Sequence, residues 1–337
     1  MNMMMREILA QAEILPDVFE KIAKDIAEIK PAKGRIFSGG CGDCAFASGA
    51  LSDVFQALGA DVQDKTAMEL AAFTKLNADD TVILSSVSGG TKRTVEAANV
   101  ARDAGARVIA VTCNPQSALA KASNDVIVLP YEPLSRKTPH TLDYGVVLVV
   151  LAALVGKLVV SRTSDLQSSV GRLGALLALL ETTASEFAEI YNPAGKVFFL
   201  GVGPDLATAE YTAAKFHEAG GLTAIAAETE NFVHGMNFML EPKDTVFILA
   251  STKPAAKRGT EVADAFKGLC KTQVISVESL DQDGVEAAIV RLFEITFRIQ
   301  FLCRSIFDGL DLELEQPRAG RPKGDAHMAA QSQAMAS

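Results

Sequence analysis

The chain contains an internal repeat, and this feature constrains its fold more than any other. The segment GRIFSGGCGDCAFASGALSDVFQALGA, from Gly34, corresponds to GKVFFLGVGPDLATAEYTAAKFHEAGG, from Gly195. In both, a short apolar run passes through a Gly-x-Gly turn into an amphipathic stretch that ends at a glycine, which predicts strand, turn and helix. A second pair of segments, from Asp79 and from Lys243, again alternates strand, loop, helix and strand. We therefore expect two similar βαβ halves.

The alternation of apolar strands and helices determines the fold class. It predicts α/β architecture, with doubly wound parallel sheets that helices cover on both faces and right-handed crossovers join. A chain of 337 residues also exceeds the ~250 residues at which a single core usually divides. We expect a helical arm over residues 1–32, a first domain over 33–165, a second domain over 166–310 and a tail over 311–337.

Outside the repeat, apolar spacing predicts further helices and one disordered end. The arm should be helical from Glu7 to Lys30 with a break near Pro16, and a long helix should run from Gln167 to Ile190. The apolar run from Gly145 to Val160 is shorter than the ~20 residues of a membrane span, so we expect a buried helix there. The last dozen residues should lack regular structure, because the apolar periodicity ends before them.

Composition excludes several classes of partner. A net charge of -9 argues against nucleic acid or an acidic membrane surface, since both require clustered Lys and Arg. The absence of Trp and the low aromatic content, 6%, argue against binding by ring stacking. Five cysteines, an odd number, and an N-terminus without the apolar core of a signal peptide indicate a reduced, cytoplasmic protein. A small molecule is the expected partner.

A loop rich in hydroxyl groups follows one predicted strand of the first half. In Leu84-Ser85-Ser86-Val87-Ser88-Gly89-Gly90-Thr91, three hydroxyls and two glycines after Ser85 come just before a helix, where backbone N–H groups favour an anion. The alternative is an ordinary helix N-cap with flexible glycines. The corresponding place in the second half reads Ala250-Ser251-Thr252-Lys253-Pro254 and lacks this spacing. A role in folding should appear in both copies, so we predict a phosphate site in the first half only, with Lys92 and Arg93 available to add charge.

The pattern Cys41-Gly42-Asp43-Cys44 requires a choice between a reactive site and a turn. A zinc site would need a second pair of ligands, and the remaining cysteines, Cys113, Cys270 and Cys303, do not have that spacing. Redox chemistry stays open as the minor alternative. We interpret the segment as a strand-to-helix loop.

These motifs resemble those of the sugar isomerase (SIS) domain proteins over nearly the whole chain. The resemblance is to tandem members such as the isomerase half of glucosamine-6-phosphate synthase, to sugar-phosphate deaminases and to deglycases of Amadori products, and it implies two flavodoxin-like SIS domains. Met5-Arg6-Glu7-Ile8 followed by Gln11 resembles the family's Met-x-Glu-Ile-x-x-Gln-Pro opening, with Ala12 in place of Pro.

The resemblance also assigns the phosphate site. The loop from Ser86 to Thr91 resembles the family's Ser-Gln-Ser-Gly-Glu-Thr sugar-phosphate loop, which implies that Ser86, Ser88, Gly89 and Thr91 bind the phosphate. Gly40-Cys41-Gly42-Asp43-Cys44 resembles a Gly-Thr-Ser turn, which implies the same role for Gly42 and Cys44. An anionic Asp43 beside a phosphate would repel it unless the side chain turns away.

The resemblance places the reacting groups in the second half. Lys215-Phe216-His217-Glu218 resembles the Lys-x-x-Glu of the synthase helix, and the family's spacing leads from Glu218 to His234. It implies Glu218 as the base, His234 as the ring-oxygen proton donor and Lys215 as the oxyanion stabiliser. Tyr211 stands where the synthase has another Glu. The tail Leu314-Glu315-Gln316-Pro317-Arg318 resembles Asp-Gln-Pro-Arg, after which a reactive Lys is expected, and Lys323 lies about one residue out of register. His140 and His217 are assigned to structure.

The implied function is that of a phosphosugar isomerase or aminosugar-phosphate deaminase. The substrate would be a ketose phosphate or amino sugar phosphate, converted through an enediol or enaminol without cofactor or metal. Two alternatives stay open: a deglycase of a phosphorylated Amadori product, and a sensor that binds sugar phosphates without turnover. We expect a homodimer with a shared active site, in which His234 acts on substrate held by the other chain. We expect no glutaminase half, and therefore expect that synthase activity would need a partner or free ammonia.

Overall fold

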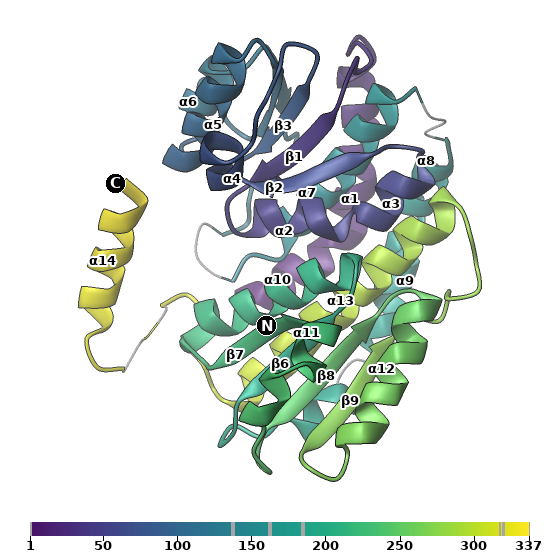
Figure 1. Ribbon diagram of the computed structural model, residues 1–337, viewed down its shortest axis with the longest axis vertical. Coiled ribbons are helices and arrows are strands. Elements are labelled where there is room, and N and C mark those ends of the chain that lie inside the picture. Colours follow the sequence, from purple (N-terminus) through teal and green to yellow (C-terminus); the bar gives the residue numbers. More distant parts are fainter. Residues whose placement is uncertain are drawn as a thin grey trace. The chain divides into compact units, whose positions relative to one another are not determined.

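The computed structural model describes residues 2–135, 139–160, 164–182, 186–316, 318 and 321–336. The chain forms two compact units whose segments alternate along the sequence (Figure 1). The first-sheet unit comprises residues 13–133, 143–170 and 320–337, and the second-sheet unit comprises residues 1–12, 134–142 and 171–319. The division differs from the predicted domains by giving the start of the arm and a short internal segment to the second-sheet unit.

The first-sheet unit contains a five-stranded parallel sheet of order β2-β1-β3-β4-β5, the flavodoxin-like order. Its strands are β1 (Ile36–Gly40), β2 (Val62–Thr66), β3 (Thr81–Ser85), β4 (Arg107–Thr112) and β5 (Asp125–Val128). Its helices are α2 (Asp43–Ala50), α3 (Ser52–Ala57), α4 (Ala67–Ala72), α5 (Lys92–Asp103), α6 (Ala118–Lys121), α7 (Leu142–Leu158) and α8 (Ser164–Gly171). The first residue of α7 and the last residue of α8 belong to the other unit. β1 and β3 are buried along their whole length, as expected of strands covered on both faces.

Both faces of this sheet are covered. On one face, Phe37, Val82 and Val108 pack with Leu70 of α4 and Leu119 of α6 into a buried cluster. Side chains alternate along β1, so Ser38 faces the opposite side, where its hydroxyl hydrogen-bonds Ser48 of α2 at 2.8 Å.

The second-sheet unit contains a four-stranded parallel sheet of order β7-β6-β8-β9. Its strands are β6 (Val197–Gly201), β7 (Ala224–Glu228), β8 (Thr245–Ala250) and β9 (Lys271–Ser276). Its helices are α9 (Leu173–Glu181), η1 (Glu186–Ile190), α10 (Pro204–Gly220), α11 (Thr229–Val233), η2 (Met236–Met239), α12 (Lys253–Phe266) and α13 (Val285–Gly309). The predicted fold class, two doubly wound parallel α/β sheets, is confirmed.

The internal repeat has a conformational counterpart. Gly42 and Gly203, at corresponding turns before α2 and α10, have φ/ψ of 56°/-130° and 59°/-129°. Asp80 and Asp244, at corresponding strand starts, are both buried, and their carboxylates pair with Arg35 and Lys196 at 2.7 and 2.8 Å. The two halves therefore share turn geometry and ion pairs as well as strand order.

Three local predictions are wrong. Pro16 lies inside a continuous helix, α1 (Met3–Asp25), which tolerates the lost hydrogen bond. The long helix expected from Gln167 is instead divided into α8 and α9, and Gly171, a poor helix former, ends the first of them. The final residues form a helix, α14 (Gly324–Ala336), without a buried face, because Ala, Met and Gln favour helix even where no apolar stripe is present.

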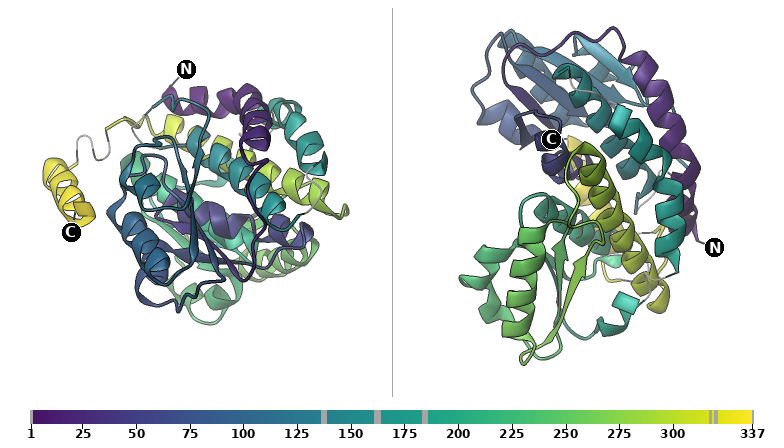
Figure 2. Two further views of the ribbon diagram at one scale, coloured as in Figure 1. Left: turned by 90° about the horizontal axis from the view of Figure 1, so that it is seen from above. Right: turned by 90° about the vertical axis from the view of Figure 1, so that its right-hand side faces the viewer.

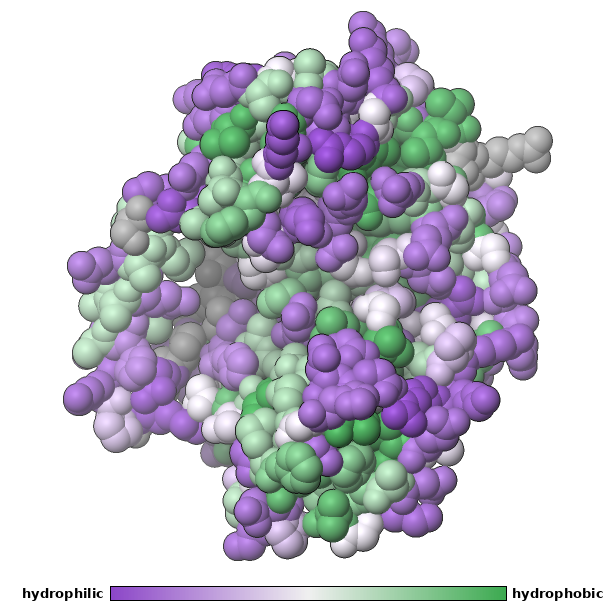
Figure 3. Space-filling model, in the orientation of Figure 1, coloured by the Kyte–Doolittle hydropathy of each residue, from purple (hydrophilic) through white to green (hydrophobic). Residues whose placement is uncertain are grey.

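The apolar run near the middle of the chain forms the buried helix α7, as predicted. Among the residues described, no helix is long and apolar enough to cross a membrane. Hydrophilic residues cover much of the face drawn in Figure 3, in keeping with a chain in which 22% of residues are charged. The views in Figure 2 show helices packed beside each sheet.

Candidate active site

The hydroxyl-rich loop connects β3 to α5, at the carboxyl edge of the first sheet. Ser86 is buried, and its hydroxyl lies 3.0 Å from the Thr91 hydroxyl and accepts from the Gly89 N–H at 3.2 Å. The exposed Ser88 accepts from the Gly90 N–H at 3.3 Å. The loop therefore brings together Ser86, Gly89 and Thr91 at the start of a helix.

Gly89 has a conformation and surroundings that only glycine fits. Its φ is +67°, and a Cβ atom there would lie 2.2 Å from the Ser117 hydroxyl and 2.7 Å from the Thr112 hydroxyl. The Thr112 hydroxyl donates to the Val87 carbonyl at 3.2 Å, and the Ser117 hydroxyl accepts from Ala120 N–H to cap α6. The path of the loop is thus determined by close packing against the next strand end.

The N-cap interpretation of this loop meets a specific difficulty. Thr91 occupies the N-cap position of α5, but its side chain makes no capping hydrogen bond. Thr252 precedes α12, the helix after the corresponding strand of the second half, and its hydroxyl accepts from Ala255 N–H. The N-terminal N–H groups of α5 are thus left without a side-chain cap from Thr91, which suits a helix that receives an anion.

The Gly-Cys-Gly-Asp-Cys turn lies beside this loop. A Cβ at Gly40 would approach the Ser85 carbonyl at 2.6 Å and the Cys44 Cβ at 2.8 Å. Burial, reinforced by the charge of Asp43, raises the pKa of the Cys44 thiol to about 12, although a hydrogen bond with the Val87 backbone opposes the shift. Cys44 is therefore a neutral thiol beside the loop. Cys41 is exposed, Cys44 is buried, and the two thiols are not joined by a disulfide.

A tyrosine–aspartate pair that the sequence did not indicate lies near the same strand ends. The Tyr131 hydroxyl donates to Asp143 Oδ1 at 2.6 Å, and Asp143 is buried in the first turn of α7. Burial, then the charge and hydrogen bond of Asp143, raise the pKa of Tyr131 well above its usual value. Asp143 also raises the pKa of Cys44, which places this carboxylate close to the turn. No spacing in the sequence links residues from these two elements.

The second-sheet unit contains the predicted Lys–Glu pair on α10. The Lys215 ammonium lies 2.7 Å from Glu218 Oε2; the side chain of Lys215 is 1% exposed and that of Glu218 is 30% exposed. The ammonium also lies 5.0 Å from the centroid of the Tyr211 ring, a cation–π contact one helical turn away. Burial raises the pKa of the Cys303 thiol on α13, while the nearby Lys215 lowers it. A buried ammonium thus supports a carboxylate that reaches solvent.

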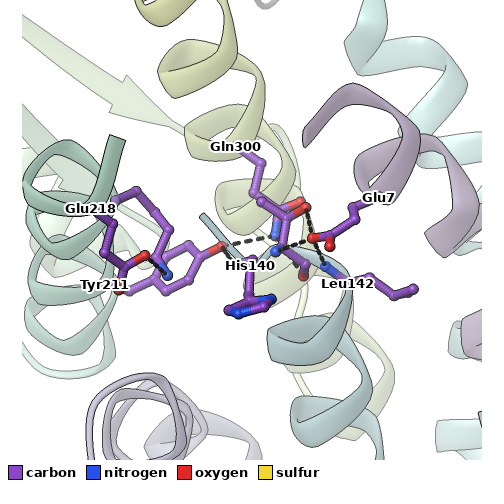
Figure 4. Close-up of polar contacts among 8 residues, drawn as sticks. Glu7, His140, Leu142, Tyr211, Glu218 and Gln300 are labelled. Carbon is purple, nitrogen blue, oxygen red and sulfur yellow. Dashed lines mark hydrogen bonds and ion pairs between the residues drawn. The ribbon is translucent and has the colours of Figure 1, made fainter. Parts of the chain in front are cut away.

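Buried polar side chains connect this pair to the start of the chain (Figure 4). The Tyr211 hydroxyl accepts from Gln300 Nε2 and donates to the His140 carbonyl, both at 3.3 Å. Gln300 Oε1 accepts from Gln11 Nε2 at 2.7 Å. Glu7 Oε2 accepts from the Thr141 N–H at 2.7 Å, the Thr141 hydroxyl at 3.2 Å and the Leu142 N–H at 3.4 Å. Glu7 and Gln11, noted in the sequence only for their family resemblance, therefore anchor this unit.

The other predicted reacting groups are His234 and Lys323. His234 is exposed at the end of α11 and close to Glu230, which forms an ion pair with Arg258 at 2.5 Å. Lys323 is exposed and belongs to the first-sheet unit. His217, on α10, contacts the Ala224 carbonyl through Nε2 at 2.9 Å. Within the second-sheet unit, the structure brings together Lys215 and Glu218.

The tail segment that precedes Lys323 lies next to the start of α1. Leu314 and Glu315 line a cavity of about 280 Å³ together with Met3, Met4 and Pro139. All of these residues belong to the second-sheet unit. Pro317, in the tail motif, lies outside the described residues.

No group of three His, Cys, Asp or Glu side chains that could hold a metal ion occurs among the described residues. The polar groups described above are of two kinds. The first-sheet unit has hydroxyls and N–H groups, and the second-sheet unit has a carboxylate, an ammonium and a phenol. The former can bind an anion, and the latter can accept a proton and stabilise a developing oxyanion.

Comparison with known proteins identifies a matching family and several relatives. The family model for the SIS domain matches residues 28–156 and 190–275. The glutamine–fructose-6-phosphate aminotransferase (isomerizing) of Aeropyrum pernix is 26% identical over 304 residues, which cover 85% of this chain and 49% of the aminotransferase. The chain thus spans about half the length of that relative.

Solved structures share the fold over nearly the whole chain. A glucosamine-6-phosphate deaminase from Thermotoga maritima has a TM-score of 0.76 at 19% identity, covering 93% of this chain and 97% of the deaminase. A tagatose-6-phosphate ketose/aldose isomerase from Escherichia coli has a TM-score of 0.73 at 19% identity, covering 91% and 92%.

Proposed function

The chain belongs to the SIS domain family, and on that premise we propose that it is an enzyme that isomerises or deaminates a phosphorylated sugar. One observation carries the proposal: a fully buried Lys215 holds the half-buried Glu218 at 2.7 Å, on the helix where a proton-transfer base is predicted. A surface ion pair would not need a buried ammonium, because burying a charge is costly. The names of the relatives support a sugar 6-phosphate as the substrate class.

Binding of the phosphate is assigned to the first-sheet unit. The hydroxyls of Ser86, Ser88 and Thr91 and the N–H groups at the start of α5 would donate to the phosphate oxygens, while Gly89 and Gly42 allow close approach of the backbone. Cys44, as a neutral thiol, adds a weak donor without adding negative charge.

Proton transfer is assigned to Glu218. An open-chain ketose phosphate loses a proton from C1 to this carboxylate, and the electron pair of the C–H bond forms the enediol while the carbonyl oxygen becomes an oxyanion. The Lys215 ammonium stabilises that oxyanion. O2 then takes up the proton that O1 gives up, and the proton held by Glu218 returns to C2, so that C1 becomes the carbonyl of the aldose. The amino sugar analogue follows the same path through an enaminol. We also propose that His234 transfers the ring-oxygen proton during ring opening and that Lys323 is the reactive lysine that captures the carbonyl covalently.

We also propose a cytoplasmic homodimer, in which the exposed His234 reaches substrate held by the other chain. Exposure of this histidine at the end of α11 supports such a role. The test below also distinguishes two other functions. One is deglycase activity on a phosphorylated Amadori product. The other is binding without turnover, which is suggested by Tyr211 at a position where the synthase has a Glu.

The test is a substrate panel followed by NMR. Purified protein is incubated in D2O with fructose 6-phosphate, tagatose 6-phosphate, glucosamine 6-phosphate and a 6-phosphorylated Amadori adduct. Deuterium at C1 or C2 together with a new sugar phosphate supports isomerisation or deamination, and release of an amine from the adduct supports the deglycase. Tight binding without any product or exchange would leave the sensor and contradict the enzyme.

A further inference from the structure

We propose that the second half of the repeat fills its own anion position with the carboxylate of Asp205, and that the uncharged thiol of Cys44, at the corresponding turn position, leaves the first half open to a phosphate. The inference rests on the proposed function and deepens it, because it names the side-chain position that decides which half of the repeat binds the sugar phosphate.

The two residues occupy the same place in the two halves. Cys44 lies in the first turn of α2 after the turn glycine Gly42, and Asp205 lies in the first turn of α10 after Gly203. The two glycines have nearly the same φ and ψ. Both side chains are buried, with Cys44 9% exposed and Asp205 1% exposed. The turns therefore place a thiol and a carboxylate at equivalent positions.

The loops that follow β3 and β8 also correspond. β3 begins at Thr81 and β8 at Thr245, and each threonine pairs with the first residue of the neighbouring strand, β1 or β6. Val87 and Ser251 lie at the same separation from these threonines, just beyond the ends of the two strands. Their backbone N–H groups therefore hold equivalent positions at the carboxyl edges of the two sheets.

The turn residue bonds to this equivalent backbone group in both halves. The Ser251 N–H donates to Asp205 Oδ2 at 2.9 Å, and both residues are buried. In the first half, a hydrogen bond with the Val87 backbone lowers the pKa of the Cys44 thiol, as donation from an N–H does. A neutral thiol is only a weak acceptor, whereas a carboxylate accepts a strong, charge-assisted bond. In the second half, an anion that belongs to the chain itself already holds this N–H.

The helix after the loop differs between the halves in the same sense. α12 begins at Lys253, directly after Thr252, whose hydroxyl caps it. α5 begins at Lys92, and the side chain of Thr91 makes no capping bond. A helical turn at Lys253 thus stands where the first half has the loop residue Gly89. An internal carboxylate and a capped helix complete the second half without a ligand.

A carboxylate at the position of Cys44 would act against a phosphate in two ways. It would take the Val87 N–H, and it would repel a phosphoryl group, whose charge near neutral pH is about −1.5 to −2. Two carboxylates, Asp43 and Asp143, already raise the pKa of the Cys44 thiol. Asp143 accepts a hydrogen bond from the Tyr131 hydroxyl at 2.6 Å. The uncharged thiol adds no further negative charge beside the loop.

The experiment transfers the turn of the second half into the first. Cys44→Asp introduces the carboxylate, and Cys44→Asn is the matched control of the same shape without charge. A second pair of variants combines Asp43→Pro with each of these changes. It reproduces the turn Gly203-Pro204-Asp205, removes the neighbouring charge and is used if Cys44→Asp does not fold. Urea denaturation checks the fold of each protein. Calorimetric titrations with inorganic phosphate and with fructose 6-phosphate, at about pH 8, measure affinity and the number of sites.

We expect wild type to bind one phosphate per chain. Cys44→Asp should bind both ligands at least ~100-fold more weakly than wild type, whereas Cys44→Asn should lose less than about tenfold.

Equal affinities of the Asp and Asn variants, both high or both low, would overturn the role of charge at this position and leave the proposed function intact. Two phosphates per wild-type chain would contradict the closure of the second half by Asp205. Failure of both Asp variants to fold would contradict the correspondence of the two turns. A wild type that binds neither ligand would remove the phosphate site of the proposed function, and this inference with it.

Discussion

Replacement of Gly89 by alanine tests whether the loop between β3 and α5 has the geometry that phosphate binding requires. A Cβ at this position would overlap the Ser117 hydroxyl at 2.2 Å and the Ser117 Cβ at 2.4 Å, with the backbone at φ +67°. The neighbouring Gly90 is the matched control, because a Cβ there would meet nothing closer than the Ser88 hydroxyl at 3.9 Å.

The expected cost has two parts. A non-glycine residue in the left-handed region costs about 1–2 kcal/mol, and overpacking against buried atoms costs about 1–3 kcal/mol. Ser117 cannot move freely, since it caps α6. Gly89→Ala should therefore lose about 3 kcal/mol of unfolding free energy, whereas Gly90→Ala should stay within about 0.5 kcal/mol of wild type.

Urea denaturation of the three proteins measures this difference, and calorimetric titration with fructose 6-phosphate measures its consequence for binding. Gly89→Ala should bind the sugar phosphate at least ~10-fold more weakly, because the loop must shift, while Gly90→Ala should bind normally. Equal stability and equal affinity of the two variants would refute the close packing on which the site depends.

Three further predictions concern the site, the repeat and the shared pocket. Ser86→Ala combined with Thr91→Ala should weaken sugar-phosphate binding by ~2 to 4 kcal/mol in calorimetry, with no effect on the poor binding of unphosphorylated sugars; unchanged affinity would remove the loop from the site. Burial raises the pKa values of Asp80 and Asp244, but the hydrogen bonds from Arg35 and Lys196 and from backbone N–H groups outweigh it and leave both below their usual value. These carboxylates therefore stabilise the fold above the unfolded pKa of ~3.9, and that stability is lost as the pH falls through the folded pKa. Asp80→Asn and Asp244→Asn should each lose about 2 kcal/mol at pH 7 in urea denaturation and show a flatter acid limb; a wild-type acid limb in both would contradict the pairing. Mixing an inactive Ser86/Thr91 double mutant with inactive His234→Gln should restore some activity if subunits exchange and pockets are shared, and verified exchange without activity would place His234 at its own chain's site.

The topology was predictable because the repeat and the strand–helix alternation leave few arrangements of parallel sheets. The local structure differed from the prediction where competing energies, which a sequence pattern does not show, decided the conformation. Pro16 is accommodated in α1 because packing of a long amphipathic helix outweighs one lost hydrogen bond. The end of the chain became helical through intrinsic propensity alone.

The loop residues of the candidate site were predictable because they are adjacent in sequence and precede a helix. The hydrogen-bonded pairs that support the site were not predictable. The Glu7 carboxylate and the Thr141 N–H are 134 positions apart, and Gln300 and the Tyr211 hydroxyl are 89 positions apart. Only the folded chain brings such residues together, so sequence spacing gave no signal that they would pair.

Glu218→Gln tests the central claim most directly. Glutamine keeps the shape of the side chain and can accept a hydrogen bond from Lys215, but it cannot accept a proton. We predict that turnover of the sugar phosphate selected by the panel falls at least ~100-fold while its dissociation constant stays within about threefold of wild type. Equal turnover by wild type and variant would contradict the assignment of Glu218 as the base and, with it, the proposed mechanism.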